Sequence, residues 1–390
     1  MTIHVTDVAI VGGGMVGGAL ALGLAQQGFT VTVLEKAAPP AFDPASAPDV
    51  RISAISAASV GLLKSLGVWD AIRAMRVHAY RRLETWEWES AHVAFDAAEL
   101  KLPELGYMVE NKVLQWGLWQ ALAAHEAVTL RVGSELKTMQ RGETQTALHL
   151  REGETIHARL VIGADGANSQ VREMAGIGVH AWQYQQSCML ISVECADDPG
   201  DSTWQQFTPS GPRAFLPLFD HWASLVWYDA PARIRQLQSM TMAQLQQEIA
   251  SHFPARLGRV TPQAAGAFPL TRRHALQYVQ PGLALVGDAA HTIHPLAGQG
   301  VNLGYRDVDA LLLLHHHLDG VNALLEILAE ARGRGEDWAS LPVLKRYQAR
   351  RRADNFIMQS GMDLFYAGFS NDLAPVRMLR NIGLMAAERA

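Results

Sequence analysis

Hydrophobic residues are arranged along this chain in two different patterns, and the first occurs at the N-terminus. Residues 8–11 are uniformly apolar, a glycine-rich turn follows, and residues 19–27 carry apolar positions at helical spacing, with Gly28 expected just past the helix end. A second strand is expected at residues 30–34. Strands that are apolar at every position are typical of parallel sheets, because such sheets are covered on both faces. This pattern predicts a parallel sheet flanked by helices.

The second pattern is an alternation of apolar and polar residues, which covers residues 80–109 and 182–268. Alternation is typical of antiparallel strands with one buried face. One amphipathic helix, with apolar residues at helical spacing between Leu237 and Ile249, is expected to interrupt the second region. These strands predict a second sheet, which either walls a pocket or serves only as a packed layer.

The last third of the chain returns to the first pattern and then becomes helical. A short buried strand at residues 282–286 precedes a glycine-rich stretch and a helix expected from about Tyr305. Beyond Gly333 the sequence predicts helix to the end, with breaks at Pro342 and Pro375.

The first turn has the spacing of a phosphate-binding loop, with Gly12, Gly14 and Gly17 between a strand and a helix. Gly12 is expected to form the tight turn, Gly14 to let a pyrophosphate approach the backbone, and Gly17 to let helix and strand pack closely. The N-terminus of the helix adds free N–H groups and a partial positive charge. The glycines alone are weak support, since an ordinary turn can contain them.

Glu35 strengthens this interpretation, because it ends the next strand at about the spacing where an acid meets a ribose 2′-hydroxyl. A carboxylate at this position disfavours a 2′-phosphate. The sequence therefore predicts a site for FAD or NAD rather than NADP. The alternative is that Glu35 is a solvated strand end.

Composition and charge exclude several other classes of protein. Of the 390 residues, 49% are hydrophobic and 18% are charged, which is typical of a globular protein, and the net charge of −5 provides no basic field for nucleic acid. Cys188 and Cys195 lack metal-ligand spacing and fit a reducing compartment. Because the first strand begins almost at once and no apolar run approaches about twenty residues, we expect a cytoplasmic protein that contacts a membrane at most from the side.

Two further glycine turns carry an acid. Asp165-Gly166 follows a buried strand, and Gly287-Asp288 follows another. An acceptor-only carboxylate suits the hydroxyls of a sugar or ribityl chain. The stretch from Pro295 to Gly300 then opens a helix whose N–H groups can face a phosphate or an electron-rich ring. Separate ligand-facing turns in one chain fit an elongated cofactor.

The order of these three motifs, together with the run from Gly287 to Gly304, resembles the single-component flavin-dependent aromatic hydroxylases, and among them the ubiquinone-biosynthesis branch. The likeness extends to residues 107–111 and 356–365 and covers almost the whole chain. It implies an α/β protein with the p-hydroxybenzoate hydroxylase fold. That fold combines a Rossmann-type FAD-binding domain with an inserted, mostly antiparallel substrate sheet and C-terminal helices. The expected FAD-binding domain comprises residues 1–75, 109–178 and 266–330, the substrate domain 76–108 and 179–265, and the helical segment 331–390.

The resemblance implies a role for each motif residue. The three glycines would hold the FAD pyrophosphate, Glu35 the adenosine ribose, and Asp165 would contact FAD and, transiently, NAD(P)H. Asp288 would bind the ribityl or pyrophosphate part, and the stretch from Pro295 to Asn302 would border the flavin ring. Arg51 matches a family arginine near the flavin phosphates, although on spacing alone it could equally form an ion pair. The full set of expected cofactor residues is Gly12, Gly14, Gly17, Glu35, Arg51, Asn111, Gln115, Asp165, Gly287, Asp288, Pro295, Gly298, Gln299, Gly300 and Asn302.

The chemistry implied by the resemblance is hydroxylation of the ring of a polyprenylated benzoquinol. O₂ is the co-substrate, NAD(P)H or another donor supplies electrons, and a flavin C4a-hydroperoxide delivers oxygen. The protein must orient the ring and keep water away. Phe215, Leu216 and Trp227 are expected to line the substrate pocket. No residue is identified as a general base, so the flavin is expected to carry the catalysis.

Several alternatives remain beside this reading. A reductase or halogenase on the same fold is one, and a non-catalytic flavoprotein-like subunit of a quinone-biosynthesis complex is another. His291 and His294 lack a carboxylate or cysteine that would complete a metal set, so no metal site is expected. The arginines at 346 and 350–352 could meet an anionic membrane or a partner, or form a solvated face above core residues.

Overall fold

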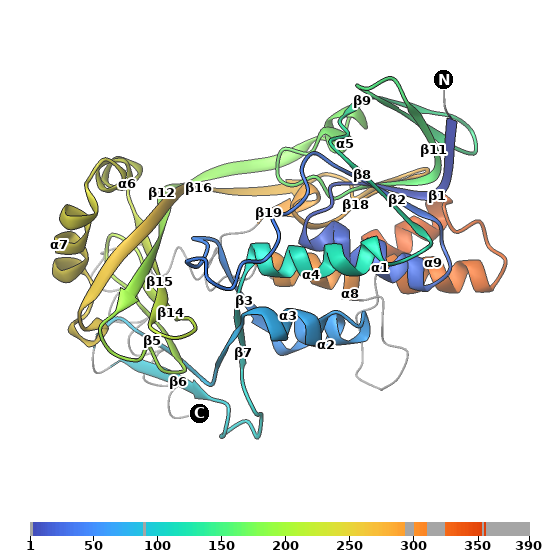
Figure 1. The fold of residues 1–390 in the computed structure, drawn as a ribbon. Coiled ribbons are helices and arrows are strands. Elements are labelled where there is room, and N and C mark those ends of the chain that lie inside the picture. The colour runs from blue at the N-terminus through green and yellow to red at the C-terminus, as the bar shows by residue number, and fades with distance from the viewer. Residues whose placement is uncertain (1–2, 89–90, 293–299, 310–323, 353–354, 356–390) are drawn as a thin grey trace.

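The computed structural model describes residues 3–88, 91–292, 300–309, 324–352 and 355, and its strands form three sheets (Figure 1). One hydrophobic core is formed by the first sheet and its helices, and a second core lies behind the second sheet. Figure 1 shows these two regions at opposite ends of the molecule, joined by two long strands. The predicted fold class, a Rossmann-type α/β unit with an inserted antiparallel sheet, is confirmed.

The first sheet has the strand order expected for a dinucleotide-binding unit. Its parallel strands run β8-β2-β1-β11-β18, so the first strand of the chain lies at the centre, next to the strand that ends before Asp165. The carboxyl ends of parallel strands meet at one edge, and this brings the three acid-bearing turns together. Its strands are β1 (Ile3–Val11), β2 (Val31–Glu35), β8 (Val128–Val132), β11 (Thr155–Gly163) and β18 (Leu283–Leu285), with antiparallel β9 (Leu136–Arg141), β10 (Thr146–Leu150) and β17 (Val279–Gln280).

Helices cover this sheet and surround α1 (Met15–Gln26), which contacts α4 (Asn111–Ala123), α8 (Gly300–Asp309) and α9 (Leu324–Gly333). Most of α1 is buried, which explains why it is apolar on nearly every side. It ends as predicted, with Gly28 in the left-handed region at φ +81°. Two short helices, α2 (Ala57–Ser65) and α3 (Trp69–Met75), complete this layer, and α5 (Gln170–Met174) follows the Asp165 turn.

The second sheet is antiparallel except where β13 pairs with β5. Two strands, β12 (Val179–Cys195) and β16 (Val260–Ala275), are 17 and 16 residues long and extend from this sheet toward the first one (Figure 1). The remaining strands are β5 (Arg82–Trp86), β6 (His92–Asp96), β13 (Ser202–Gln206), β14 (Arg213–Pro217), β15 (Trp222–Asp229) and β19 (His291–Thr292).

The strands expected in residues 80–109 are divided between two sheets. β5 and β6 join the second sheet, whereas β7 (Gly106–Glu110) pairs with β3 (Ile52–Ser56) and β4 (His78–Tyr80) in a small sheet of its own. The predicted domain boundary at residues 108–109 lies within β7. The small sheet therefore connects the two larger regions, and the domain boundaries themselves stay predictions.

One helix prediction was wrong in detail. The single helix expected between Leu237 and Ile249 is two helices, α6 (Pro231–Gln238) and α7 (Met242–His252). The reason is local: Thr241 and Gln244 form a capping box, which satisfies the free N–H groups of a new helix start. The helix expected from about Tyr305 already includes Gly300, where the stretch from Pro295 was expected to open a helix.

Pro342 does not interrupt a helix in the structure. Residues 341–352 are helical, and Pro342 lies in the first turn, where its missing N–H would have no partner in any case. Pro375 lies outside the described residues. Among the helices that are described, none is long and apolar enough to cross a bilayer.

Candidate active site

The glycine-rich turn between β1 and α1 has the geometry that its spacing predicts. Gly12 has φ +104°, which side chains rarely adopt, and a Cβ on Gly17 would lie 1.9 Å from the Gly12 carbonyl oxygen. Gly14 differs from both, because a Cβ there would meet no atom within 4 Å and its φ of −68° is ordinary. Gly12 and Gly17 are therefore required by the fold, whereas Gly14 keeps the space in front of the turn open.

Glu35 lies beside this turn at the end of β2. Its Oε2 accepts a hydrogen bond from the Gly13 N–H at 2.7 Å, and its Oε1 accepts one from the Lys36 N–H at 2.9 Å. These bonds fix the carboxylate at the edge of the groove in front of Gly14. A fixed carboxylate is the group expected to receive a ribose hydroxyl.

Two side chains of α4 hold the turn from behind. Trp119 donates its indole N–H to the Gly13 carbonyl oxygen at 2.8 Å, and the Gln115 amide donates to the same oxygen at 3.4 Å. Gln115, predicted to touch the cofactor, does not line the groove but supports the turn that lines it. Trp119 was missed, because nothing in the local sequence around residue 119 indicates which turn its N–H meets.

The Asp165-Gly166 turn follows β11 and faces the same groove. Asp165 Oδ2 accepts hydrogen bonds from the Gln170 and Val171 N–H groups at 2.7 and 3.2 Å, while its Oδ1 is buried with no partner among the described residues. Arg172, which was not predicted, joins this turn to the next one: its guanidinium donates to the carbonyl oxygens of Ala167 and Ala289, each at 2.8 Å.

The Gly287-Asp288 turn follows β18 and presents Asp288 to the cavity. Gly287 has φ +58°, and a Cβ there would contact Val16 of α1 at 3.3 Å. The carboxyl of Asp288 opens into the cavity, yet protein surrounds it closely enough that burial raises its pKa above the usual 3.8, against the opposing charges of His291 and Arg51. At a given pH, Asp288 is therefore protonated more often than an ordinary surface aspartate.

These turns line one continuous groove with a volume of about 850 Å³. Glu35 and Asp288 both border it, so the ends of the predicted cofactor site share one space. Gly300 also borders it, while Pro295, Gly298 and Gln299 lie outside the described residues. The predicted residues along the groove are Gly12, Gly14, Glu35, Arg51, Asn111, Asp165, Gly287, Asp288 and Gly300.

Asn302 has a different role from the one expected. Its Oδ1 accepts hydrogen bonds from the Ser56 N–H at 3.1 Å and the Ser59 hydroxyl at 2.8 Å, and its Nδ2 donates to the Ala54 carbonyl oxygen at 2.7 Å. Asn302 is buried and does not line the groove. It fastens α8 to the junction of β3 and α2, because its amide matches the backbone groups exposed there.

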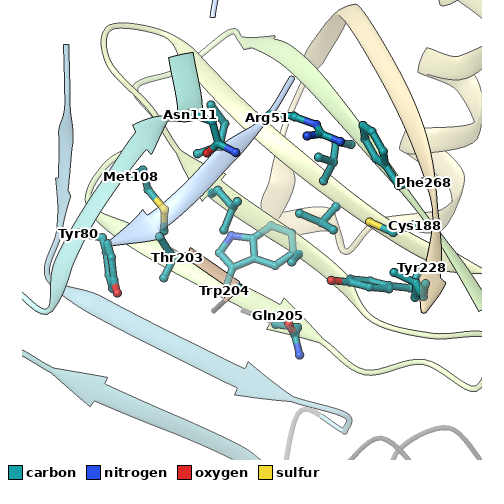
Figure 2. Close-up of a pocket in the computed structure, with 18 of the residues that line it drawn as sticks. Arg51, Tyr80, Met108, Asn111, Cys188, Thr203, Trp204, Gln205, Tyr228 and Phe268 are labelled. Carbon is teal, nitrogen blue, oxygen red and sulfur yellow. The ribbon is translucent and has the colours of Figure 1, made fainter. Parts of the chain in front are cut away.

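A second, smaller cavity of about 330 Å³, the ring chamber, lies between the second sheet and the small sheet. Figure 2 shows Tyr80 and Met108 on one side of it and Cys188, Tyr228 and Phe268 on the other, with Arg51 and Asn111 at one end. The chamber is mostly apolar. The polar residues in its lining include Thr203, Gln205 and Thr271.

The ring chamber opens into the cofactor groove, since five residues line both: Arg51, Ile52, Asn111, Asp288 and Gly300. Arg51 lies with its guanidinium 4.7 Å from the centre of the Phe268 ring, and Asn111 accepts a hydrogen bond from the Ser53 hydroxyl at 2.6 Å. The junction is therefore polar and the chamber beyond it apolar.

Of the three predicted pocket residues, only Leu216 lines the chamber. Phe215 and Trp227 point to the opposite face of the second sheet, where they pack in a core with Leu237 and Ile249 of α6 and α7. Side chains alternate between the faces of a strand, so a choice that is wrong by one residue selects the wrong face.

Two buried groups in the chamber wall are held neutral. Burial raises the pKa of the Cys188 thiol to about 12, and burial also raises that of the Tyr228 hydroxyl well above 10. Neither group can serve as a base near neutral pH. A hydroxyl on a bound ring would meet neutral hydrogen-bonding groups at this wall and the Asp288 carboxyl at the junction with the groove.

Comparison with known proteins shows the family to which this chain belongs. An FAD binding domain model matches residues 5–335. The chain is 76% identical, over 100% of its own length and 96% of the relative, to the 3-demethoxyubiquinol 3-hydroxylase of Escherichia coli. The chain belongs to the ubiquinone-biosynthesis family of FAD-dependent hydroxylases. Another member, human ubiquinone biosynthesis monooxygenase COQ6, is 32% identical over 99% of this chain and 90% of its own.

Solved structures agree with this hydroxylase fold. The p-nitrophenol 4-monooxygenase PnpA of Pseudomonas putida superposes with a TM-score of 0.78 at 18% identity, covering 100% of this chain and 95% of that one. PqsL of Pseudomonas aeruginosa superposes with a TM-score of 0.79 at 20% identity, covering 99% and 100%. At such low identity the likeness concerns the fold alone.

The residues of the groove fit FAD, the cofactor of this hydroxylase family. The open space at Gly14 suits a pyrophosphate, the N-terminus of α1 faces it, and the unpartnered Asp165 Oδ1 is a buried acceptor in need of a donor. In this arrangement Glu35 would hold the adenosine end and Asp288 the part nearer the chamber. The flavin would supply the redox chemistry at the junction.

Two predictions outside the groove concern the C-terminal third. His291 is hydrogen-bonded to Asp307, and within the described residues no cluster of three or more potential metal ligands is found. Of the four arginines, only Arg351 is buried, against Asp307. Arg346, Arg350 and Arg352 are exposed; Arg346 pairs with Glu336 at 2.6 Å, and Arg350 lies 3.7 Å from Glu326.

Proposed function

We propose that this enzyme hydroxylates the ring of a polyprenylated benzoquinol in ubiquinone biosynthesis, with 2-octaprenyl-3-methyl-6-methoxy-1,4-benzoquinol as the substrate. The observation that carries the proposal is the continuity of an apolar ring chamber with the cofactor groove through a polar junction. The activity that names the 76% identical relative, 3-demethoxyubiquinol 3-hydroxylase, supports the substrate class.

The size of the chamber supports a ring as the buried part of the substrate. Small-molecule sites measure roughly 300–1,000 Å³, and the chamber, at about 330 Å³, is at the lower end. A substituted benzoquinol fits such a space, whereas a long polyprenyl chain does not. We infer that the tail extends out of the chamber while the ring faces the groove.

Bound FAD, once reduced by NAD(P)H or another donor, activates O₂ for insertion into the ring. This chain's residues orient the ring and keep water away from it. Leu216, Cys188 and Phe268 provide an apolar wall, and Arg51 and Asn111 provide polar contacts where the chamber meets the groove. Tyr228 and Cys188, whose pKa values burial raises, are expected to stay neutral beside the ring.

Among the described residues that line the chamber, the one carboxylate is Asp288, at the junction with the groove, so the apolar wall itself offers the ring little activation. A benzoquinol carries two ring oxygens and is already electron-rich. It needs less activation by deprotonation than a phenol with a single hydroxyl. The enzyme is therefore expected to contribute mainly orientation and exclusion of water.

The direct test is incubation of the purified holoenzyme with NAD(P)H, ¹⁸O₂ and a short-chain analogue of the quinol. Mass spectrometry should find one ¹⁸O atom in the ring-hydroxylated product. Oxidation of NAD(P)H without product would indicate a reductase instead. A matched reaction with Leu216→Trp, which fills the chamber, should consume NAD(P)H with less product.

Complementation distinguishes an enzyme from a non-catalytic subunit. In an E. coli strain that lacks the 3-demethoxyubiquinol 3-hydroxylase, the wild-type chain should restore ubiquinone, and Asp288→Ala should leave the unhydroxylated quinone to accumulate. Full rescue by Asp288→Ala would favour a subunit that only holds the lipid within a biosynthetic complex.

We also propose that the enzyme takes its substrate from a membrane surface, alone or with other subunits of a ubiquinone-biosynthesis complex. The polyprenyl chain of the substrate motivates this, since such a chain partitions into lipid. Flotation of the purified protein with vesicles that contain the quinol tests it. Protein that stays at the bottom of the gradient would indicate delivery by a partner subunit.

A further inference from the structure

A fully buried ion cluster lies directly beneath the Gly287-Asp288 turn. At its centre is Asp307 of α8, which has no exposed surface. Asp307 Oδ2 accepts hydrogen bonds from the Gly287 backbone N–H at 2.7 Å and from His291 Nε2 at 2.6 Å. Its Oδ1 accepts one from Arg351 Nε at 2.8 Å. One carboxylate therefore receives a backbone, an imidazole and a guanidinium donor.

The first two donors belong to the two ends of one short turn. Gly287 comes directly before Asp288, and His291 follows it by three residues. Asp307 thus fixes the turn at both ends, while Asp288 between them faces the cavity. Loss of either hydrogen bond would let the backbone of Asp288 move, and its carboxylate with it.

The third donor connects the turn to the C-terminal helix. Arg351 lies in the helical residues 341–352, and its Nη2 donates to Asn355 Oδ1 at 2.7 Å. Asn355 in turn donates to the Tyr278 hydroxyl at 3.2 Å, and the Tyr347 hydroxyl donates to the Leu285 carbonyl oxygen at 2.8 Å, just before the turn. The helix is therefore joined to the Asp288 turn by directional bonds as well as by apolar contacts.

The charges of this cluster keep Asp307 ionised and fix the geometry around it. Burial opposes ionisation of Asp307, but the charges and hydrogen bonds of His291 and Arg351 outweigh it and hold the pKa of the carboxyl below its usual value. Apolar side chains of similar volume commonly stabilise a core at least as well as a buried ion pair does. A buried charge cluster at this place is thus better explained by the geometry it imposes than by stability.

We propose that Asp307 is a positioning residue for the cofactor: it sets the orientation of Asp288, and Arg351 makes the C-terminal helix part of the FAD site. The inference rests on the proposed assignment of Asp288 to FAD. Asp307 itself lines neither the groove nor the ring chamber, so it acts through the turn.

The second sheet offers a matched control. Asp229 is also a buried carboxylate with a guanidinium donor, Arg213 at 3.0 Å, a ring N–H donor, Trp227 at 3.2 Å, and a backbone donor, the Ala230 N–H at 2.8 Å. Asp229 lines neither the groove nor the chamber. Asp229→Asn and Asp307→Asn therefore remove the same charge from the same kind of donor set, one away from the cofactor and one beneath it.

The experiment measures release of FAD from the holoenzymes, by the rise in flavin fluorescence on dilution, together with visible circular dichroism of the bound flavin. Asp307→Asn is expected to weaken FAD binding about tenfold or more, because one donor would face the amide nitrogen. Its flavin dichroism should change as well. Asp229→Asn should lower the melting temperature and leave the FAD dissociation constant and dichroism unchanged.

The Arg351 variants separate charge from loss of a helix contact. Arg351→Met should weaken FAD binding severalfold, and Arg351→Lys, which keeps a cation, should recover part of the loss. If Asp307→Asn does not fold, the double variant Asp307→Asn/Arg351→Met, which removes the uncompensated charge, takes its place. Wild-type FAD affinity in both Asp307→Asn, or its double substitute, and Arg351→Met would overturn the proposal. Failure of the wild-type protein to bind FAD would instead overturn the cofactor assignment.

Discussion

The cofactor groove and the ring chamber are formed by different kinds of structure. The groove is made of turns at the carboxyl ends of parallel strands, where Gly12, Gly14 and Asp288 act through backbone shape and one carboxylate. The chamber is made of strand faces, where alternate residues of β12, β14 and β15 enter the cavity or turn away from it. The shape of the groove is determined by residues close together in the sequence, whereas the lining of the chamber is determined by the pairing of strands far apart in the sequence.

The largest expected effect tests the groove. Gly14→Val should lower FAD affinity by about 1,000-fold or more, roughly 4 kcal/mol, and give colourless protein, because the side chain would enter the space kept for the pyrophosphate. The fold should survive, since the backbone at Gly14 suits any residue. Flavin absorbance after purification and a thermal melt measure the two effects.

Gly18→Ala is the matched control for that substitution. Its Cβ would meet the Leu118 side chain at an ordinary 3.6 Å, on the side of α1 away from the groove. This variant should be yellow. A yellow Gly14→Val protein with normal affinity would remove the pyrophosphate from its proposed place.

The next largest effect compares the two faces of the second sheet, one of which lines the chamber. Phe215→Ala should lower the free energy of unfolding by about 3 kcal/mol, because Phe215 packs in the core behind the sheet and stacks at 5.3 Å on Trp204, which also borders the chamber. Its KM for the quinol should change less than that of Leu216→Trp. Leu216→Trp should do the reverse, raising KM about tenfold with a normal melting temperature.

Adjacent residues with opposite phenotypes would establish which face meets the substrate. Chemical denaturation and steady-state kinetics of both variants supply the measurements. Should Phe215→Ala raise KM while Leu216→Trp leaves it unchanged, the chamber would lie on the wrong side of the sheet.

This contrast explains how much the sequence could predict. The glycine turn, Glu35 and Asp288 line one groove as expected, because each is set by residues close to it in the chain. The strands that precede the glycine turns were recognised by their short apolar runs, such as residues 8–11 and 283–286. Phe215 and Trp227 were assigned to the pocket because both are large and apolar, yet the pairing of Phe215 with Leu225 and of Trp227 with Met189 places them behind the sheet. No pattern within one strand shows which face will be covered by helices.

Contacts between distant segments escaped prediction for the same reason. Asp307 meets Arg351 across 44 residues, and Trp119 meets Gly13 across 106. Each residue type alone is compatible with many environments. Arg346, Arg350 and Arg352 are exposed, as a basic face requires, whereas Arg351 is buried because its guanidinium pairs with Asp307, 44 residues earlier in the chain.

A smaller, pH-dependent effect is expected at the far end of the second sheet. Glu84 lies between Arg256 at 3.0 Å and His92 at 2.7 Å. Burial opposes its ionisation, but the hydrogen bonds of Arg256 and His92 lower the pKa of its carboxyl from 4.5 to about 2. Since the pKa is lower in the folded protein, the stabilisation is complete above 4.5 and is lost as the pH falls toward 2.

Glu84→Gln should therefore lower the free energy of unfolding by about 2 kcal/mol at neutral pH, with a difference that shrinks below pH 4.5. Urea titrations at several pH values measure it. Glu154→Gln, which breaks a more exposed pair with Arg131 at 3.5 Å, should show little effect at any pH. Neither variant should change FAD affinity, and equal, pH-independent losses in the two would contradict the account of Glu84.

The smallest effect concerns the support behind the glycine turn and refines the contrast between groove and chamber. Trp119→Phe keeps an aromatic ring in place but removes the N–H that donates to the Gly13 carbonyl oxygen at 2.8 Å. Loss of one such bond costs about 1 kcal/mol, so FAD affinity should fall about fivefold. Flavin fluorescence titration measures it, and Trp69→Phe, a substitution at a buried ring that lines neither cavity, should leave affinity unchanged. If both variants bind FAD normally, the turn is rigid through its glycines alone, and the groove depends even more on local sequence than its contacts indicate.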